Sequence, residues 1–168
     1  LEGEVSLPGY REPAEVRKAM EWADIYLVTS DRKEGWGAVV NEAMNSGCAG
    51  EADAMIGAAP YLIRPGQNGY AYETGREDQL LQIVSGLLQD RESCRRIGEN
   101  AYDTIQKEWN AEVAAERLTA FCIGKGFLRT DAKGTEKTYE LPASGPCSVA
   151  PVISERKMYR AMKEGRIL

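Results

Sequence analysis

The 168-residue sequence contains no histidine. This absence excludes serine and cysteine nucleophiles that depend on an imidazole, zinc sites with histidine ligands, and acid–base catalysis by histidine. The four cysteines form no Cys-x-x-Cys pair and indicate neither a metal site nor an oxidising compartment, so we expect reduced thiols and no bound metal. Any catalysis must therefore use carboxylates, backbone amides and cations.

Positive charge and long apolar runs are also scarce. The formal net charge is −5, which disfavours a broad nucleic-acid-binding surface. No stretch approaches the roughly 20 consecutive apolar residues of a membrane-spanning helix, so we expect no transmembrane segment. The charge is uneven, because residues 1–123 carry −9 and residues 124–168 carry +4. The last quarter is either a segment that docks on the acidic body or a solvated basic tail.

The apolar pattern of the first 46 residues predicts strands and helices in alternation. We expect a short strand at Val5–Leu7, a helix over 14–23, a buried strand over 25–29 and a helix over 37–46 that ends at Gly47. A strand, a helix and a strand in this order predict a parallel βαβ unit. The expected fold class is therefore α/β, with a Rossmann-like parallel sheet flanked by helices.

The rest of the chain is predicted to be mainly helical. A short strand at 70–72 precedes three helices, the last of which has Asn110 as its N-cap, and we assign their apolar stripes to the core. Glycines and prolines then predict an extended connector over 124–153 and a short helix from Ser154 to Glu164. We therefore divide the chain into a Rossmann-like half domain, residues 1–123, and a C-terminal extension, residues 124–168.

Residues 30–44 are the candidate functional segment. They follow an apolar strand and open a helix, which places them at the C-terminal edge of a parallel sheet, where open α/β folds bind ligands. Glycines at 35 and 37 free the backbone, and the amides of Gly37, Ala38 and Val39 are the unpaired donors of a helix start, which favour an anion such as a diphosphate. A glycine-rich turn that caps itself or binds water explains the same residues equally well.

Two carboxylates, Glu34 and Glu42, flank this segment. Eight positions correspond to about 12 Å along a helix, although Glu34 lies in the preceding loop. Glycoside hydrolases hold two carboxylates about 5–10 Å apart, and the longer span better suits two hydroxyl-rich groups on either side of a phosphate. The remaining interpretation is that Glu34 is solvated and that Glu42 caps or pairs on the helix surface.

Residues 34–44, Glu-Gly-Trp-Gly-Ala-Val-Val-Asn-Glu-Ala-Met, resemble the Glu-x7-Glu signature of retaining glycosyltransferases of family 4. The resemblance extends over roughly residues 5–123 and includes the segments 23–24, 45–48, 56–63, 66–69 and 108–110. It implies part of the C-terminal, donor-binding domain of a GT-B enzyme, a fold with two Rossmann-like domains. The implied reaction moves a hexose from a nucleotide diphosphate sugar to an acceptor without a metal or other cofactor.

The resemblance also implies roles for individual residues. Glu34 is the catalytic residue and contacts donor sugar hydroxyls beside the anomeric carbon, and Glu42 accepts hydrogen bonds from the ribose. The donor sugar and diphosphate are held by the backbone of Gly35, Trp36, Gly37, Ala38 and Val39. The family binds its acceptor, here a glycan or a lipid, through an N-terminal domain, so we expect the isolated chain to be inactive. The expected location is cytoplasmic, at the periphery of the inner membrane for the full-length protein.

The sequence departs from the family pattern after Cys48, where an ordinarily apolar strand contains Glu51 and Asp53. Burying either carboxylate unpaired is costly, so we expect either a frayed strand or partners for both side chains. The Arg/Lys pair with which the family holds the diphosphate is also missing. The alternative hypothesis is therefore a noncatalytic, truncated Rossmann module that mediates protein assembly through residues 124–168.

Overall fold

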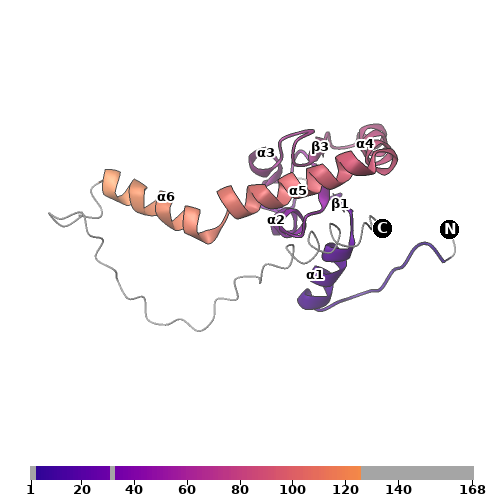
Figure 1. Ribbon diagram of the computed structural model, residues 1–168, viewed down its shortest axis with the longest axis horizontal. Coiled ribbons are helices and arrows are strands. Elements are labelled where there is room, and N and C mark those ends of the chain that lie inside the picture. Colours follow the sequence, from indigo (N-terminus) through magenta and orange to yellow (C-terminus); the bar gives the residue numbers. More distant parts are fainter. Residues whose placement is uncertain (1–2, 31–32, 126–168) are drawn as a thin grey trace.

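The computed structural model describes residues 3–30 and 33–125, so the predicted connector and C-terminal helix lie outside the described residues. Figure 1 shows a small sheet surrounded by helices, with the last described helix extending away from it. The sheet has three parallel strands in the order β1-β2-β3, namely β1 (Ile25–Val28), β2 (Ala49–Asp53) and β3 (Tyr70–Tyr72). The α/β fold with a parallel sheet is therefore confirmed.

The N-terminal segment confirms one predicted element and contradicts another. α1 (Pro13–Trp22) begins with proline in its first turn, and the backbone amide of Glu12 donates to the Glu15 carboxylate at 3.2 Å. The predicted strand at Val5–Leu7 is wrong, because this segment pairs with no described strand and Leu7 is 92% exposed. A strand requires a hydrogen-bonded neighbour, and the segment runs away from the sheet (Figure 1).

The strands and helices pack into two main apolar clusters. On one face of β2, Ala52 packs with Val40 and Met44 of α2 (Ala38–Asn45) and with Ile105 of α5 (Arg91–Glu108). On the other face, Ala49 packs with Leu87 of α4 (Glu77–Gln89) and with Cys94 and Ile97 of α5. Alternate residues of a strand face opposite sides, which is why a single strand joins both clusters.

α5 lies directly on the turn that joins α2 to β2. Gly47 ends α2 with φ 74°, as predicted, and a Cβ on Gly98 of α5 would collide with the carbonyl oxygen of Gly47. Close packing of this kind requires glycine at position 98. α5 therefore packs against α2, which contains the second half of the candidate functional segment, and against β2, which follows it.

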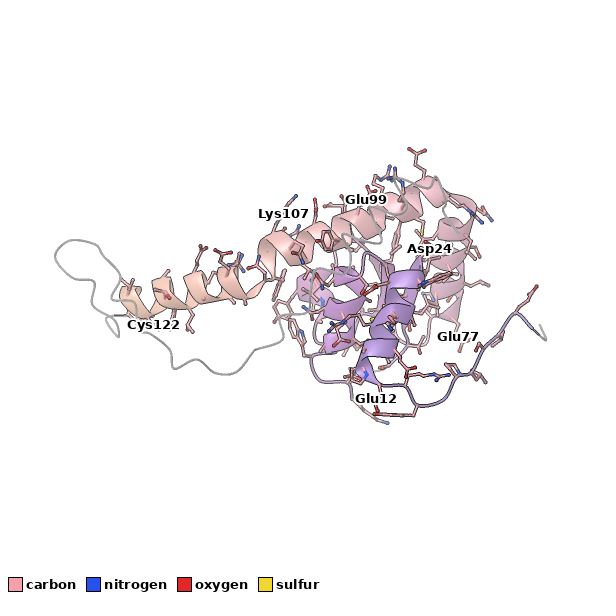
Figure 2. The ribbon with its side chains drawn as sticks, turned by 60° about the horizontal axis from the view of Figure 1, so that its bottom comes forward. Glu12, Asp24, Glu77, Glu99, Lys107 and Cys122 are labelled. Carbon is pink, nitrogen blue, oxygen red and sulfur yellow. The ribbon has the colours of Figure 1, made fainter. Side chains whose placement is uncertain are left out.

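The last described helix, α6 (Ala111–Gly124), begins at the predicted cap, where the Asn110 side chain accepts a hydrogen bond from the amide of Val113 at 2.8 Å. Its predicted core face is wrong, because α6 buries no side chain among the described residues and Leu118 and Phe121 are 64% and 55% exposed. Figure 1 shows the helix projecting from the body, and Figure 2 shows the same helix with its side chains drawn. None of the described helices is long and apolar enough to cross a membrane.

The two carboxylates of β2 have different environments. Asp53 accepts hydrogen bonds from the amide of Met55 at 2.8 Å and from the hydroxyl of Thr74 at 2.7 Å. Glu51 is 1% exposed, and neither of its oxygens has a hydrogen-bond partner among the described residues. Burial raises the pKa of Glu51 to about 7. The expectation of a frayed strand is wrong, and the expectation of partners is confirmed for Asp53 only.

Candidate functional site

The candidate site lies where β1 ends and the chain turns into α2. Gly37 is the N-cap of α2 and has φ 78°, a left-handed conformation that L side chains rarely adopt. A Cβ at this position would also lie 2.6 Å from Cγ2 of Ile56. Backbone conformation and packing therefore both require glycine at the start of this helix.

Two backbone hydrogen bonds attach this loop to the segment that precedes α3 (Ala59–Leu62). The amide of Gly57 donates to the carbonyl of Gly35 at 3.1 Å, and the amide of Ala58 donates to the carbonyl of Trp36 at 2.7 Å. A Cβ on Gly57 would collide with the carbonyl oxygen of Gly35. The glycines of the two segments thus allow their backbones to approach closely, and the loop is bound to a second element.

The side chain of Trp36 provides three further attachments. Its Nε1 donates to Oδ1 of Asn41 at 2.8 Å, and its ring centroid lies 5.7 Å from that of Tyr61 and 5.9 Å from that of Trp109. Sequence reasoning did not identify Asn41, Tyr61 or Trp109 as site residues. Two features of the sequence point to these residues: Asn41 lies inside the motif, and Tyr61 and Trp109 lie in segments that carry the family resemblance.

The first turn of α2 leaves its amides free. Val40 donates to the carbonyl of Gly37 at 2.9 Å, whereas the amides of Gly37, Ala38 and Val39 donate to no other described residue. No side chain of the described residues caps the helix, and the choice between an anion and water as the partner of these amides stays a prediction. Free amides together with the helix dipole make this helix start suited to an anion.

The two motif carboxylates lie on either side of these amides along the chain. The Cγ of Glu34 is 3.5 Å from the position that a Cβ on Gly37 would occupy, and Glu42 projects from α2. Both side chains are exposed, and neither forms a hydrogen bond or ion pair with the described residues. Burial, and then the negative charge of Glu42, raises the pKa of Tyr26. Glu42, exposed on α2, is available to accept hydrogen bonds from a ligand.

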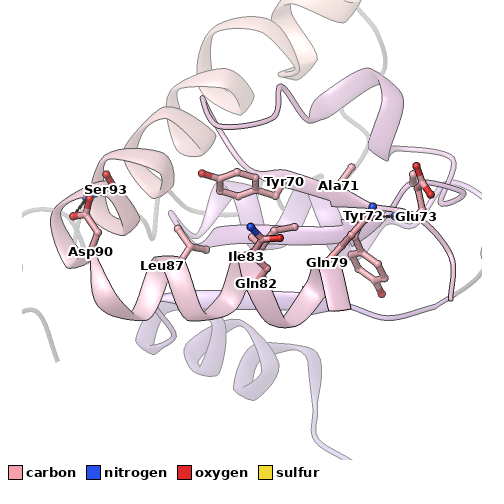
Figure 3. Close-up of a pocket in the computed structure, with 12 residues that line it drawn as sticks. Tyr70, Ala71, Tyr72, Glu73, Gln79, Gln82, Ile83, Leu87, Asp90 and Ser93 are labelled. Carbon is pink, nitrogen blue, oxygen red and sulfur yellow. Dashed lines mark hydrogen bonds between the residues drawn. The ribbon is translucent and has the colours of Figure 1, made fainter. Parts of the chain in front are cut away.

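A separate hollow of about 660 Å³ lies between β3 and α4 (Figure 3). Tyr70 and Tyr72 of β3 line one side, and Gln79, Ile83 and Leu87 of α4 line the other. None of the sequence-predicted site residues contributes to it. This hollow and the candidate anion site are therefore different places in the fold.

Comparison with known families agrees with this geometry. Residues 1–104 match the family described as glycosyl transferases group 1. The chain belongs to this family. The match contains the whole glycine loop, both motif carboxylates and all three strands.

Two curated relatives each align with more than two thirds of this chain. N-acetyl-alpha-D-glucosaminyl L-malate synthase from Bacillus anthracis is 34% identical over 121 residues, which are 71% of this chain and 30% of that protein. Sulfoquinovosyl transferase SQD2 from Arabidopsis thaliana is 29% identical over 119 residues, which are 68% of this chain and 23% of that protein. The chain therefore spans less than a third of the length of either relative.

A solved structure supports the fold of this glycosyl transferase group 1 chain. The C-terminal domain of a glycosyl transferase group 1 family protein from Francisella tularensis has a TM-score of 0.57 and 28% sequence identity. The similarity covers 62% of this chain and 53% of that domain. The parallel sheet with its flanking helices is therefore the Rossmann-like fold of a GT-B C-terminal domain, and the individual roles of Glu34 and Glu42 stay predictions.

Proposed function

We propose that this chain is the donor-binding part of a retaining glycosyltransferase that moves a hexose from a nucleotide diphosphate sugar to a glycan or lipid acceptor without a bound metal. One observation carries the proposal: the uncapped first turn of α2 lies between two exposed carboxylates that have no partner among the described residues. The names of two relatives, an N-acetyl-alpha-D-glucosaminyl L-malate synthase and a sulfoquinovosyl transferase, describe the joining of a sugar to another molecule. Family and site chemistry thus point in the same direction.

In this proposal the backbone amides and the two carboxylates bind different parts of the sugar donor. The amides of Gly37, Ala38 and Val39 hold the diphosphate and stabilise the negative charge that develops on it as the sugar leaves. Glu34 accepts hydrogen bonds from sugar hydroxyls next to the anomeric carbon, and Glu42 accepts them from the ribose. Carboxylates suit this task because they accept two hydrogen bonds from neighbouring hydroxyls.

The acceptor and the cations for the diphosphate are assigned to other parts of the full-length protein. This chain corresponds to 30% of the length of one relative and 23% of the other. We propose that a second domain faces the loop of residues 33–37 and supplies the acceptor site, so the isolated chain binds a nucleotide without transferring sugar.

Calorimetric titration with UDP, GDP and ADP tests the donor site. We expect one nucleotide to bind, and Glu42→Ala to weaken that binding by about 10- to 100-fold because a charged acceptor of ribose hydroxyls is lost. Glu34→Ala should leave nucleotide binding nearly unchanged and impair sugar transfer in the full-length protein. Glu116→Ala, at an exposed position on α6, is the matched control.

Two results would contradict the proposal. Equal and negligible effects of Glu34→Ala and Glu42→Ala would remove the assigned roles. Absence of heat with all three nucleotides, in the chain and in the full-length protein, would favour the noncatalytic assembly module. That alternative predicts a change in oligomeric mass when residues 124–168 are deleted, because the enzyme does not require this segment for self-association.

A further inference from the structure

We propose that Trp109 is a positioning residue, which holds the Trp36 ring and, through it, the loop whose amides bind the donor. This inference rests on the proposed function where it concerns the donor, and on the geometry alone where it concerns the loop. Trp109 lies at the junction of α5 and α6, 73 positions after Trp36 in the sequence. Its ring centroid lies 5.9 Å from that of Trp36, with a tilt of 38° between the two ring planes.

The position of Trp109 is set by the helices and not by the loop. Its backbone amide donates to the carbonyl of Ile105 at 3.2 Å, and its side chain packs against the cluster that contains Ile105 and Ala101. The next residue, Asn110, donates from Nδ2 to the carbonyl of Gln106 and so ties the start of α6 to the last turn of α5. Trp109 is therefore held in place by contacts that do not involve the loop.

The position of Trp36, in contrast, depends on its contacts. Trp36 is 41% exposed and is held by the rings of Tyr61 and Trp109 and by the hydrogen bond to Asn41. Tyr61 is itself mostly exposed, so Trp109 is the more buried of the two aromatic neighbours. Loss of the Trp109 ring thus removes the more buried of the two aromatic contacts that hold the Trp36 indole.

A displacement of Trp36 would also move the first of the anion-binding amides, because the two are adjacent in the chain. Trp36 precedes Gly37, the N-cap with φ 78°, and its carbonyl accepts the hydrogen bond from Ala58 at 2.7 Å. The peptide between Trp36 and Gly37 carries the first of the three free amides of the helix start. Contacts that hold the indole therefore also fix the orientation of the Gly37 N–H group, which must point at the ligand. A fixed orientation of this kind is the condition for electrostatic preorganisation.

Hydrogen exchange in the ligand-free chain, measured by NMR, tests the positioning role without any nucleotide. The amide of Ala58, bonded to Trp36, reports on the loop, and the amide of Ala54, bonded to the carbonyl of Tyr72 at 2.9 Å, is the internal reference. In Trp109→Ala we expect exchange about three- to tenfold faster at Ala58 and unchanged at Ala54, because one aromatic contact is lost. Trp109→Phe should recover most of the protection, and Trp22→Ala, at an exposed position on α1, should change neither amide.

Other outcomes of this exchange experiment would overturn the positioning role. Equal acceleration at Ala54 and Ala58 would show general destabilisation, and unchanged exchange at Ala58 would show that the loop does not need Trp109. If Trp109→Ala does not fold, Trp109→Leu keeps the apolar volume without the aromatic ring, and the same comparison of the two amides applies to it.

Titration with UDP, GDP and ADP tests the link to the donor. We expect Trp109→Ala to lower the affinity for the nucleotide that binds, by a factor similar to the increase in the exchange rate of the Ala58 amide. Trp109→Phe should restore part of this affinity. Faster exchange at Ala58 with unchanged nucleotide affinity would overturn the link between Trp109 and the donor site. Absence of nucleotide binding by the wild-type chain and by the full-length protein would instead overturn the proposed function, and the exchange result would still decide whether Trp109 holds the loop.

Discussion

Replacement of Glu51 by glutamine is expected to remove a pH-dependent destabilisation of the folded protein. Glu51 lies in the central strand, is 1% exposed and has no hydrogen-bond partner among the described residues, so its charged form is poorly solvated. Burial raises its pKa from the ordinary 4.5 to about 7. The folded protein therefore binds a proton at this side chain more tightly than the unfolded chain does.

The sign and size of the effect follow from the difference between the two pKa values. Below pH 4.5 both states carry the proton, and the full stabilising contribution of the neutral carboxyl is present. As the pH rises from 4.5 to 7, the unfolded chain loses the proton first, and the free energy of unfolding falls. Over this interval the pKa difference of Glu51 corresponds to a loss of about 3 kcal/mol.

Urea unfolding between pH 4.5 and 8.5 measures this contribution. We expect Glu51→Gln to be of similar stability to the wild type near pH 4.5 and more stable above pH 7, because its amide carries no charge at any of these values. Comparing the two proteins at each pH cancels the titration of all other groups. Glu116→Gln, at an exposed position on α6, should follow the wild type across the whole range. A constant difference between Glu51→Gln and the wild type would refute the reasoning.

Three further predictions concern packing and capping. Gly98→Ala should destabilise the protein by about 1–3 kcal/mol through its clash with the turn before β2, whereas Gly86→Ala, in an open position on α4, should stabilise it by about 0.5–1 kcal/mol. Urea unfolding measures both, and equal effects would contradict the close approach of α5. Asn68→Ala should lower the free energy of unfolding, measured by thermal unfolding, by about 2–4 kcal/mol, because the buried side-chain amide forms hydrogen bonds with Leu62, Arg64 and Thr104. A loss under about 1 kcal/mol would argue against this network. Asn110→Ala should cost about 0.5–2 kcal/mol and reduce the helical circular dichroism signal, and an unchanged spectrum would show that α6 does not need this cap.

Periodicity and glycine placement predicted much of the fold. The helix at 14–23 became α1, the strand at 25–29 became β1, and the helix at 37–46 with its stop at Gly47 became α2. These predictions hold because they depend on contacts between residues close in sequence. The segment Val5–Leu7 has the same local pattern as a strand, but a strand forms only beside another strand, and no local pattern reports whether that neighbour exists.

The candidate site shows the same division. The carboxylates and glycines of residues 34–42 were identifiable because the anion-binding start of a helix is a local device, with a short and recognisable spacing. The partners of Trp36 were not identifiable in this way, because Tyr61 and Trp109 approach it from α3 and from the end of α5. Their contact depends on how the helices pack and not on any spacing within the motif.

Burial separates most clearly what local sequence decides from what tertiary structure decides. The sequence was sufficient for the α/β class, the glycine loop and the two flanking carboxylates, because these depend on backbone conformation and on chemical type. Only the tertiary structure decided that Glu51 is buried without a partner while Asp53 is hydrogen-bonded, and that the apolar side chains of α6 face away from the core. Side-chain burial depends on every element that packs nearby, so of two carboxylates in the same strand one can be hydrogen-bonded and the other, two residues away, unpaired.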